Sequence, residues 1–508
     1  MPGQAVETVA ARRRVCAELP EFAWRPVLAI GAALAVLLLA TSGRYGYHRD
    51  ELYFLAAGHH LAWGYPDQPA LIPALARLMS AMSPGSVVVL RLPSDVASGV
   101  TVVATALMAR ELGSSRGAQL LAAGSAAAAT VVQAAGHLLS TATLNLTFWS
   151  VIAWLVIRIL RTGNARLWIL VGFIAGVGLN DSDQVAFLIA GVAVGIAVAG
   201  PRSTFRSCWP WLGGLVAALL WTPYLVWQAR HGWPELSIAR AIANGRSGTS
   251  APRWQLLPQQ LVLVSPYLAP VWIAGLVRLL RNPTYRWCRA LAVAWVFLAV
   301  VFLVSGGKPY YLGAMLPLLL AAGAEPTIAW ARQQHRRRVA LGAGLVLSLT
   351  ALPVTQPLVP LAVLHDTPIV SLNYDAGETV GWPRIVSEVA AAYQAIPEAN
   401  RSATVLLGSN YGEAGALDRY GPALGLPRAY GVQNAYWLWG PPPDTATAAI
   451  AIGFDRARLE GICRQLTLLT RLDNRLSVND DEQGAPVWLC NGLFRPWSAI
   501  WRQLRDYG

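Results

Sequence analysis

The amino-acid sequence predicts a polytopic α-helical membrane protein with about eleven transmembrane helices and a small α/β domain outside the cytoplasm. The 508 residues are 55% hydrophobic and only 13% charged, whereas about a quarter of the residues of a soluble protein are charged. Apolar stretches recur along the chain as far as residue 362, and the tail then alternates strand-like and helix-like runs. This composition excludes intrinsic disorder, and five cysteines are too few for a disulfide scaffold.

Eleven stretches are apolar and close to the length of about 20 residues that a membrane span needs. The first follows a run of three arginines, as a signal peptide would, but no small-residue cleavage site comes after it. We therefore interpret it as a membrane anchor. The predicted spans are 26–42, 92–110, 117–137, 140–160, 166–180, 184–200, 209–228, 257–279, 289–305, 310–331 and 339–362.

The loops between these spans predict the orientation of the chain. Alternate loops hold 19 arginines against five acids, and the positive-inside rule places such loops in the cytoplasm. Residues 1–25 are then cytoplasmic, 26–365 form the transmembrane domain, and an odd number of spans puts the tail, 366–508, outside. The net charge of +13 is thus largely an orientation signal, and we expect no nucleic-acid partner.

The tail is predicted to fold as a small α/β domain. Strand-like runs at 404–411, 447–454 and 485–490 are separated by helix-like runs, among them an amphipathic stretch through Leu466 and a final helix in PWSAIWRQLRDYG. Cys463 and Cys490 both lie in this exported region, where a disulfide persists, so we expect them to be bonded. Cys16, Cys208 and Cys288 are expected to be free thiols.

The first outer loop, 43–91, holds the strongest candidates for chemistry. His48, Arg49, Asp50 and Glu51 follow the first span within a few residues, at a depth where an unpaired carboxylate is costly. The structural alternative is a cap on an amphipathic helix. A cap accounts for one carboxylate but not for an adjacent pair flanked by His and Arg, so the pattern favours an active site.

Two other outer segments carry candidate substrate contacts. Asp67 and Gln68 lie among three prolines, a pattern that is also typical of a stiff turn before the next span. Lys308, the single lysine beside 39 arginines, lies in SGGKPYYLGAMLP with Tyr310 and Tyr311. A lysine and two tyrosine hydroxyls suit a phosphate. The alternative is a snorkelling interface lysine, but this chain uses arginine almost everywhere else.

The remaining candidates are weaker. Arg230 and His231 open a basic outer loop that suits an anionic partner, although a solvated loop accounts for them equally well. His137 matches an interior histidine better than a catalyst. Asp181 and Asp183 form an Asp-x-Asp pattern that could hold a divalent cation, but their loop is very short and no βαβ unit surrounds it.

Several of these segments resemble one family. HRDELYF, DQPAL, AAGHLLSTAT, QARHGWPEL and GKPYYLGAMLPLLLAAGA resemble the GT-C membrane glycosyltransferases, in particular the bacterial branch grouped with protein O-mannosyltransferases and aminoarabinose transferases. The tail, with GWPRI and NYGEAGALDRYGPALGLP, is similar to that of actinobacterial members. The resemblance covers nearly the whole chain from about residue 25.

The resemblance implies a polyprenyl-phosphate-linked sugar as donor, with mannose as the first choice, and chemistry at the outer leaflet. Asp50 matches the catalytic base, with Glu51 beside it, and Lys308, Tyr310 and Tyr311 match the region that holds the donor phosphate. The chain departs from the family pattern at Pro69-Ala70-Leu71, at Asn145, where relatives carry an acid nearby, and at Asp181-Ser182-Asp183, where many relatives carry a lysine. The last departure puts one phosphate contact in question.

Chemical reasoning agrees with this interpretation. A lipid phosphate is a good leaving group, so one base suffices for an inverting displacement. We expect Asp50 to deprotonate the acceptor, Glu51 with His48 or Arg49 to position it or a cation, and Arg230 to help hold the phosphate.

No cofactor is required by this scheme, although a divalent cation is an open alternative. The expected partners are the lipid-linked sugar, the bilayer, and an acceptor that is a protein, a glycan, a lipid or a secondary metabolite. A transporter or a non-catalytic lipid-binding protein are the competing interpretations. A transporter would carry charge near the bilayer midplane and repeated halves, whereas most ionisable residues here lie at predicted span ends and no repeat is evident.

Overall fold

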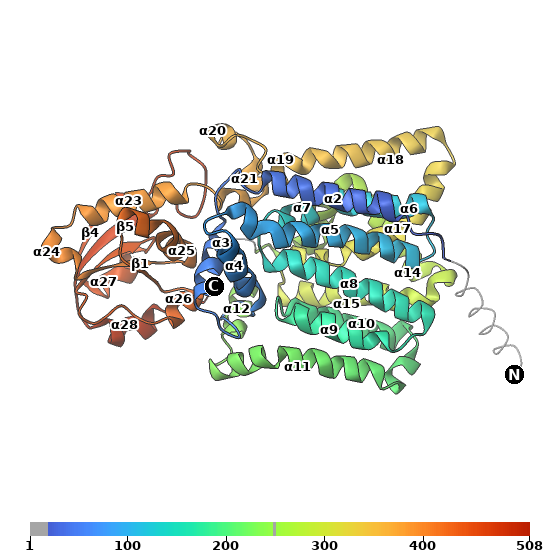
Figure 1. Cartoon of the computed structure of the whole chain (residues 1–508), viewed down its shortest axis with the longest axis horizontal. Coiled ribbons are helices and arrows are strands. Elements are labelled where there is room, and N and C mark those ends of the chain that lie inside the picture. The colour runs from blue at the N-terminus through green and yellow to red at the C-terminus, as the bar shows by residue number, and fades with distance from the viewer. Residues whose placement is uncertain (1–18, 247–249, 508) are drawn as a thin grey trace, which may run out of the picture.

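The computed structural model describes residues 19–246 and 250–507 as a bundle of long helices with a five-stranded sheet at one end (Figure 1). Helix α2 (Trp24–Thr41) starts at the end of the bundle that lies farthest from the sheet. Cys16 and most of the cytoplasmic segment predicted at 1–25 lie outside the described residues.

Six helical segments of the described chain are long and apolar enough to cross a membrane. They make the protein a multi-pass membrane protein. The number of spans rises to eight if each of two bent helix pairs is one span, so the count of eleven stays a prediction. The six segments are α2, α5 (Val87–Glu111), α8 (Thr141–Thr162), and Cys208–Arg230, Pro283–Ser305 and His335–Thr355, which contain α11 (Trp209–Arg230), α15 (Arg289–Ser305) and α18 (His335–Ser348).

Two predicted spans are sharply bent helix pairs, which corrects the expectation of single straight helices there. The stretch 257–279 is divided between α13 (Leu256–Val264) and α14 (Ala269–Arg281), at a bend of 89°. Ser265 has a positive φ of 98°, and Pro266 lacks the N–H that a continuous helix needs. The stretch 117–137 is divided between α6 (Arg116–Ala128) and α7 (Thr130–Gly136), which meet at 53°.

Shorter helices complete the bundle and its two ends. The predicted spans 166–180 and 184–200 appear as α9 (Leu167–Leu179) and α10 (Gln184–Ala199). The predicted span 310–331 is divided between α16 (Pro309–Gly313) and α17 (Leu316–Arg332). Further short helices are α3 (Arg49–His59), α4 (Leu71–Met82), α12 (Pro234–Ala243), α19 (Leu352–Thr355), α20 (Leu361–Leu364), α21 (Ile369–Leu372) and α22 (Tyr374–Gly377).

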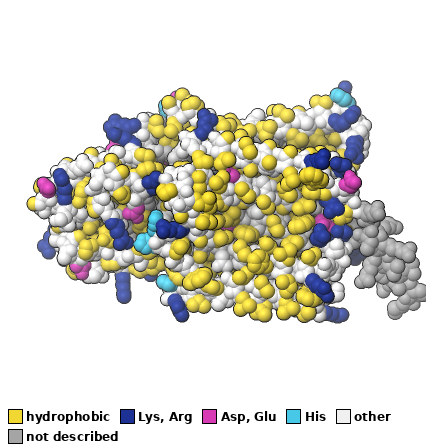
Figure 2. All heavy atoms as spheres, in the orientation of Figure 1, with side chains coloured by type: hydrophobic (Ala, Val, Ile, Leu, Met, Phe, Trp, Pro, Cys, Tyr) yellow, Lys and Arg dark blue, Asp and Glu magenta, His cyan; other side chains and the backbone are white. Residues whose placement is uncertain are grey.

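The core of the bundle is built from small and aliphatic side chains. Residues 316–324 at the start of α17 are all buried, as expected for a helix that neighbours surround on every side. Glycines let other helices approach closely: Gly172 of α9 faces the backbone of Gly213 in α11. Hydrophobic side chains cover the flank of the bundle that Figure 2 shows. Leu215, Leu219 and Val304 are among the exposed hydrophobic residues of the bundle helices. This surface suits contact with lipid.

The sheet at the end of the bundle has the strand order β2-β1-β3-β5-β4. β1 pairs in parallel with β2 and β3, and β5 pairs antiparallel with β3 and β4. The predicted strands at 404–411, 447–454 and 485–490 correspond to β1, β3 and β5. The strands are β1 (Thr404–Gly408), β2 (Ala429–Gly431), β3 (Ala448–Ile452), β4 (Cys463–Arg471) and β5 (Pro486–Leu493).

Both faces of the sheet are covered, because alternate residues of each strand point to opposite sides. Leu406 and Ile450 belong to a buried cluster with residues of α3 and of three tail helices, whereas Leu407 belongs to a cluster on the other face that includes Trp497. The first outer loop thus shares a hydrophobic core with the tail. The tail helices are α23 (Trp382–Gln394), α24 (Glu398–Arg401), α25 (Tyr411–Tyr420), α26 (Asn434–Leu438), α27 (Arg456–Glu460) and α28 (Trp497–Leu504).

One element of the tail was predicted wrongly. The amphipathic run expected to continue through Leu466 is a helix for five residues only, α27, and then becomes strand β4. Pairing with β5 decides this, because β4 forms the edge of the sheet. The final helix α28 matches the prediction.

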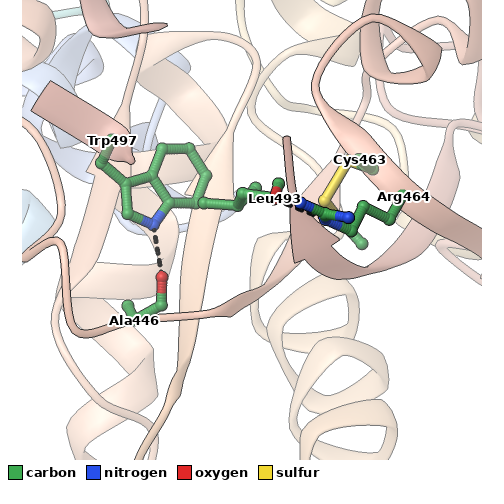
Figure 3. The surroundings of a disulfide bond; sticks show 6 residues. Ala446, Cys463, Arg464, Leu493 and Trp497 are labelled. Carbon is green, nitrogen blue, oxygen red and sulfur yellow. Dashed lines mark hydrogen bonds between the residues drawn. A yellow bond between two sulfur atoms is a disulfide. The ribbon is translucent and has the colours of Figure 1, made fainter. Parts of the chain in front are cut away.

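The predicted disulfide between Cys463 and Cys490 is present and joins β4 to β5 (Figure 3). Trp497 packs nearby and donates its indole N–H to the carbonyl of Ala446 at 3.0 Å. Cys208 and Cys288 are free thiols in the described part of the chain, as expected.

Candidate active site

A cavity of about 670 Å³ lies where the helix bundle meets the tail. It receives side chains from the first outer loop, the loop between α9 and α10, helix α12, the segment after α15, and the tail. Ten residues predicted from the sequence line it: His48, Arg49, Asp50, Asp67, Gln68, Asp181, Asp183, Lys308, Tyr310 and Tyr311.

Asp50 reaches the cavity because it begins helix α3. His48 is the N-cap residue, and a capping box links it to Glu51, whose carboxylate accepts the backbone N–H of His48 at 2.9 Å. A cap on this helix was the structural alternative for the acidic pair, and the cap is formed by His48 together with Glu51, not by Asp50. The Asp50 side chain, 38% exposed, is thereby left facing the cavity.

Glu51 does not line the cavity, which corrects its predicted place beside the acceptor. Its carboxylate is fully buried and forms an ion pair with Arg91 of α5 at 2.8 Å. The same arginine contacts Nε2 of His137 at 3.3 Å, so the predicted substrate contact His137 is also an interior residue. These three residues fix the loop to the bundle instead of facing a substrate.

Three groups surround the Asp50 carboxylate and its backbone. The hydroxyl of Tyr411, in the tail, donates to Oδ1 of Asp50 at 2.8 Å. The backbone N–H of Asp50 donates to Nδ1 of His48 at 3.2 Å, and the other ring nitrogen of His48 lies 3.7 Å from Asp375. Burial lowers the pKa of His48, but the carboxylates of Asp50 and Asp375 outweigh it and raise the pKa overall.

Lys308 lies in the turn between α15 and α16, and a glycine in the sequence makes this turn possible. Helix α15 ends at Gly306 in the left-handed conformation, with φ of 74°, which glycine adopts at little cost. Lys308 then caps α16, with its ammonium 5.9 Å from the ring of Tyr310. Burial lowers the pKa of Lys308, whereas Asp50 and Asp375 raise it, with a net decrease. An incoming phosphate would favour the charged lysine.

A second group of carboxylates lines another part of the cavity. Asp67 accepts hydrogen bonds from Tyr53 at 2.7 Å and from Asn434 at 3.1 Å, and burial raises its pKa to about 7. Asp183 and Glu235 both contact the hydroxyl of Tyr224, at 3.3 and 3.1 Å.

The hypothesis that Asp181 and Asp183 hold a divalent cation is not supported by a third ligand among the described residues. Within residues 19–246 and 250–507, no three His, Cys, Asp or Glu side chains are placed to hold a metal ion together. Burial raises the pKa of Asp183 to about 6 and that of Asp181 well above its ordinary value. Both residues nevertheless lie at the cavity, so the hypothesis stays a prediction.

Arg230 and His231, predicted to contact the donor, lie outside the cavity. Both are exposed at the end of α11, where His231 stacks on Trp227 with ring centroids 4.0 Å apart. Arg246, farther along the same basic loop, lines the cavity instead. The loop was identified from its charge, but charge alone did not show which arginine turns inward.

Two tail residues at the cavity, Tyr411 and Asn434, were not predicted from the sequence. Tyr411 and Asn434 lie 361 and 367 residues after the aspartates that they contact. The segment GSNYGEAGAL is a turn that leads into α25, with Asn410 as the cap. The first residue of that helix carries the contact to Asp50.

Comparison with known proteins shows which proteins this chain resembles. A model of the dolichyl-phosphate-mannose-protein mannosyltransferase family matches residues 67–227, less than half of the chain. No curated protein matches the sequence. Among solved structures, ArnT from Cupriavidus metallidurans bound to undecaprenyl phosphate is 14% identical with a TM-score of 0.58, and covers 91% of this chain and 97% of its own.

The chain has the GT-C membrane glycosyltransferase fold.

A second GT-C structure supports the assignment, and the resemblance predicted from the sequence is confirmed. The arabinofuranosyltransferase AftD from mycobacteria is 17% identical, with a TM-score of 0.54 over 94% of this chain. This chain spans 40% of the length of AftD. In this GT-C fold, the cavity at the sheet end of the bundle is lined by both the predicted base and the predicted phosphate ligands.

Proposed function

We propose that the protein is an integral membrane glycosyltransferase that moves a sugar from a polyprenyl-phosphate donor to an acceptor on the outer face. The observation that carries the proposal is one cavity lined by both Asp50 and Lys308. One residue supplies a base and the other a cation for a leaving phosphate. The family match and the fold of ArnT, a structure bound to undecaprenyl phosphate, support the same donor class, and mannose is the first choice of sugar.

The reaction needs few groups. Asp50 takes the proton of the acceptor hydroxyl or amine as its oxygen or nitrogen bonds to the anomeric carbon, and the bond from that carbon to the phosphate oxygen breaks. The polyprenyl phosphate leaves with the electron pair. Lys308 and the hydroxyls of Tyr310 and Tyr311 stabilise its charge, with Arg246 as the loop arginine at the cavity. One base and no covalent intermediate give inversion.

The test is Asp50→Asn in membranes supplied with lipid-linked mannose. Loss of general-base catalysis lowers transfer by about 10²- to 10⁴-fold, measured as labelled product or as released polyprenyl phosphate. Asp366→Asn is the matched control, because that side chain is 71% exposed and away from the cavity. Unchanged transfer in Asp50→Asn would remove the base assignment. A change in substrate flux without any transfer would instead favour a transporter.

A further inference from the structure

The tail turns the carboxyl ends of three parallel strands towards the cavity. β1 pairs in parallel with β2 on one side and with β3 on the other. Residues that follow each of these strands line the cavity, and we call them the tail wall. They are Ser409, Asn410 and Tyr411 after β1, Gln433 and Asn434 after β2, and Gly453, Phe454 and Asp455 after β3.

The tail wall includes a topological switch point of the sheet. The chain runs from β1 to β2 and then returns to β3, on the opposite side of β1. In open α/β sheets, such a reversal leaves a crevice outside the carboxyl ends of the strands, where ligands bind. Gly453 has a positive φ of 71°, and a Cβ there would lie 2.6 Å from the hydroxyl oxygen of Ser409. The loops after β1 and β3 therefore lie against each other at the cavity.

Polar side chains of the tail wall keep unused hydrogen-bonding groups. Asn434 is 4% exposed, and its Nδ2 donates to Asp67 at 3.1 Å, which leaves Oδ1 buried without a partner among the described residues. Gln433 accepts the backbone N–H of Tyr411 through Oε1 at 3.1 Å, and its Nε2 donates to no described residue. Asp455 is the N-cap residue of α27, yet its side chain makes no capping hydrogen bond. Within the described chain, an amide donor and two acceptor groups thus remain for a ligand.

Direct contacts connect the tail wall to the candidate base. The hydroxyl of Tyr411 donates to Asp50 at 2.8 Å, and the backbone N–H of the same tyrosine donates to Gln433. The ring of Tyr411 packs on Tyr53, with centroids 4.8 Å apart, which holds it in place. One residue therefore joins the base to the amide of Gln433, and a ligand held by this amide lies beside Asp50.

The tail wall lies on the acceptor side of the base. Lys308, Tyr310 and Tyr311 follow α15 of the bundle, whereas the wall belongs to the tail, beyond the end of the bundle (Figure 1). The polyprenyl chain of the donor stays in the lipid around the bundle, which keeps the phosphate on the bundle side of the cavity. In an inverting displacement the acceptor approaches the sugar from the side opposite the phosphate. The substrate that meets the tail wall is therefore the acceptor.

We propose that the tail wall binds the acceptor and that this acceptor is a saccharide. Sugar hydroxyls both donate and accept hydrogen bonds, which matches the donor of Gln433 and the acceptors of Asn434 and Asp455. A peptide matches less well, because β1 and β3 already have a neighbour on each side and cannot pair with an added strand. The cavity of about 670 Å³ has the size of a small-molecule site. The proposal rests on the proposed function and names the acceptor class for it.

The test compares two kinds of probe that carry a hydroxyl. One is a set of methyl glycosides of mannose, glucose, galactose and arabinose, and the other is N-acetylserinamide and N-acetylthreoninamide. Each is titrated onto the full chain in nanodiscs, with and without polyprenyl phosphate, and followed by saturation-transfer NMR. We expect at least one glycoside to bind in both conditions, about tenfold more tightly than the blocked amino acids, the effect of one hydrogen bond to a charged group. With lipid-linked mannose present, mass spectrometry should detect the same glycoside carrying the transferred sugar.

Two variants test the tail wall itself. Gln433→Glu keeps an oxygen for the N–H of Tyr411 but removes the amide donor, and Asp455→Asn removes a charge while keeping the shape. Each should raise the KM for the glycoside about tenfold and leave the KM for the lipid-linked sugar unchanged. Glu460→Gln, at the other end of α27 and 56% exposed, is the matched control and should change neither. Each variant is first compared with the parent protein by thermal melting, so that a folding defect in one leaves the other as the test.

Several results would overturn the proposal. Equal binding of glycosides and blocked amino acids would do so, as would a glycoside KM that neither variant changes. Displacement of the glycoside by lipid-linked mannose, or a higher KM for the lipid-linked sugar in both variants, would place the tail wall on the donor. Release of polyprenyl phosphate without any glycoside binding would overturn the tail wall alone. Glycoside binding that depends on Asp455, without any release, would overturn the proposed function and, with it, the acceptor role.

Discussion

Asp50 and Glu51 are adjacent in sequence yet have different environments. Successive residues of a helix point in different directions, about 100° apart, so one carboxylate faces the cavity while the other faces α5. Glu51 is fully buried against Arg91, whereas Asp50 is 38% exposed. The pair looked like one functional unit in the sequence, but one residue holds the loop and the other is the candidate base.

The structure identifies Tyr411 as a hydrogen-bond partner of Asp50. We predict that Tyr411 positions the Asp50 carboxylate. Tyr411→Phe removes the 2.8 Å hydrogen bond, and a hydrogen bond to a charged group contributes about 1.5–3 kcal/mol. We expect kcat to fall by about tenfold or more, with the KM for the lipid-linked sugar unchanged. Steady-state transfer assays check this, with Tyr430→Phe on β2 as control. A rise in that KM at constant kcat would contradict the positioning role.

The raised pKa of Asp67 predicts that the stability of the protein depends on pH. Burial raises its pKa from 3.8 to about 7, so the folded protein binds this proton more tightly than the unfolded chain does. Its contribution to the free energy of unfolding is fully present below pH 3.8, the ordinary pKa that applies in the unfolded chain, and is lost as the pH rises towards 7. We expect the melting temperature to fall across this window, and to fall less in Asp67→Asn. Identical pH profiles for the two proteins would contradict this assignment.

At the scale of elements, glycines determine which helices can pack closely. A Cβ on Gly213 of α11 would collide with the backbone of Trp168 at the start of α9, whereas one on the adjacent Gly214 would meet nothing within 4 Å. We predict that Gly213→Ala destabilises the protein by about 1–3 kcal/mol and that Gly214→Ala has little effect. Melting in nanodiscs compares the two. Equal melting temperatures would mean that α9 and α11 are not held together at this point.

Elements also show where sequence patterns reach their limit. The apolar stretch 257–279 is long enough for a span, but Pro266 and the positive φ of Ser265 break it. The run before Leu466 is amphipathic, yet its last residues belong to strand β4, because the edge of the sheet offers β5 as a partner. Periodicity describes local preference, and pairing with a distant strand overrides it.

At the scale of the whole molecule, the cavity is completed by joining the two ends of the chain. Tyr411 reaches Asp50 and Asn434 reaches Asp67, while Arg49 pairs with Glu378 and Asp481. α3 and the tail also share a buried hydrophobic cluster. The tail therefore forms one wall of the cavity.

The orientation of the molecule is the prediction at this scale. The arginine-rich loops predict that the bundle end opposite the sheet faces the cytoplasm. We expect alkaline phosphatase fused after residue 508 to be active, since it matures only outside the cytoplasm. Green fluorescent protein fused before residue 1 should fluoresce. The reverse pattern of the two reporters would contradict the orientation and would place the cavity on the wrong side for the proposed reaction.

The sequence by itself determined the class of protein, most of the helices, the disulfide between Cys463 and Cys490, and the segments that carry Asp50 and Lys308. These depend on composition, local periodicity and short motifs, which a single segment contains. Only the tertiary structure decided which of Asp50 and Glu51 faces the cavity, which loop arginine turns inward, and that Tyr411 and Asn434 belong there. It also showed that acids of three separate segments line one cavity. Such choices depend on packing between segments hundreds of residues apart, and no local pattern records that packing.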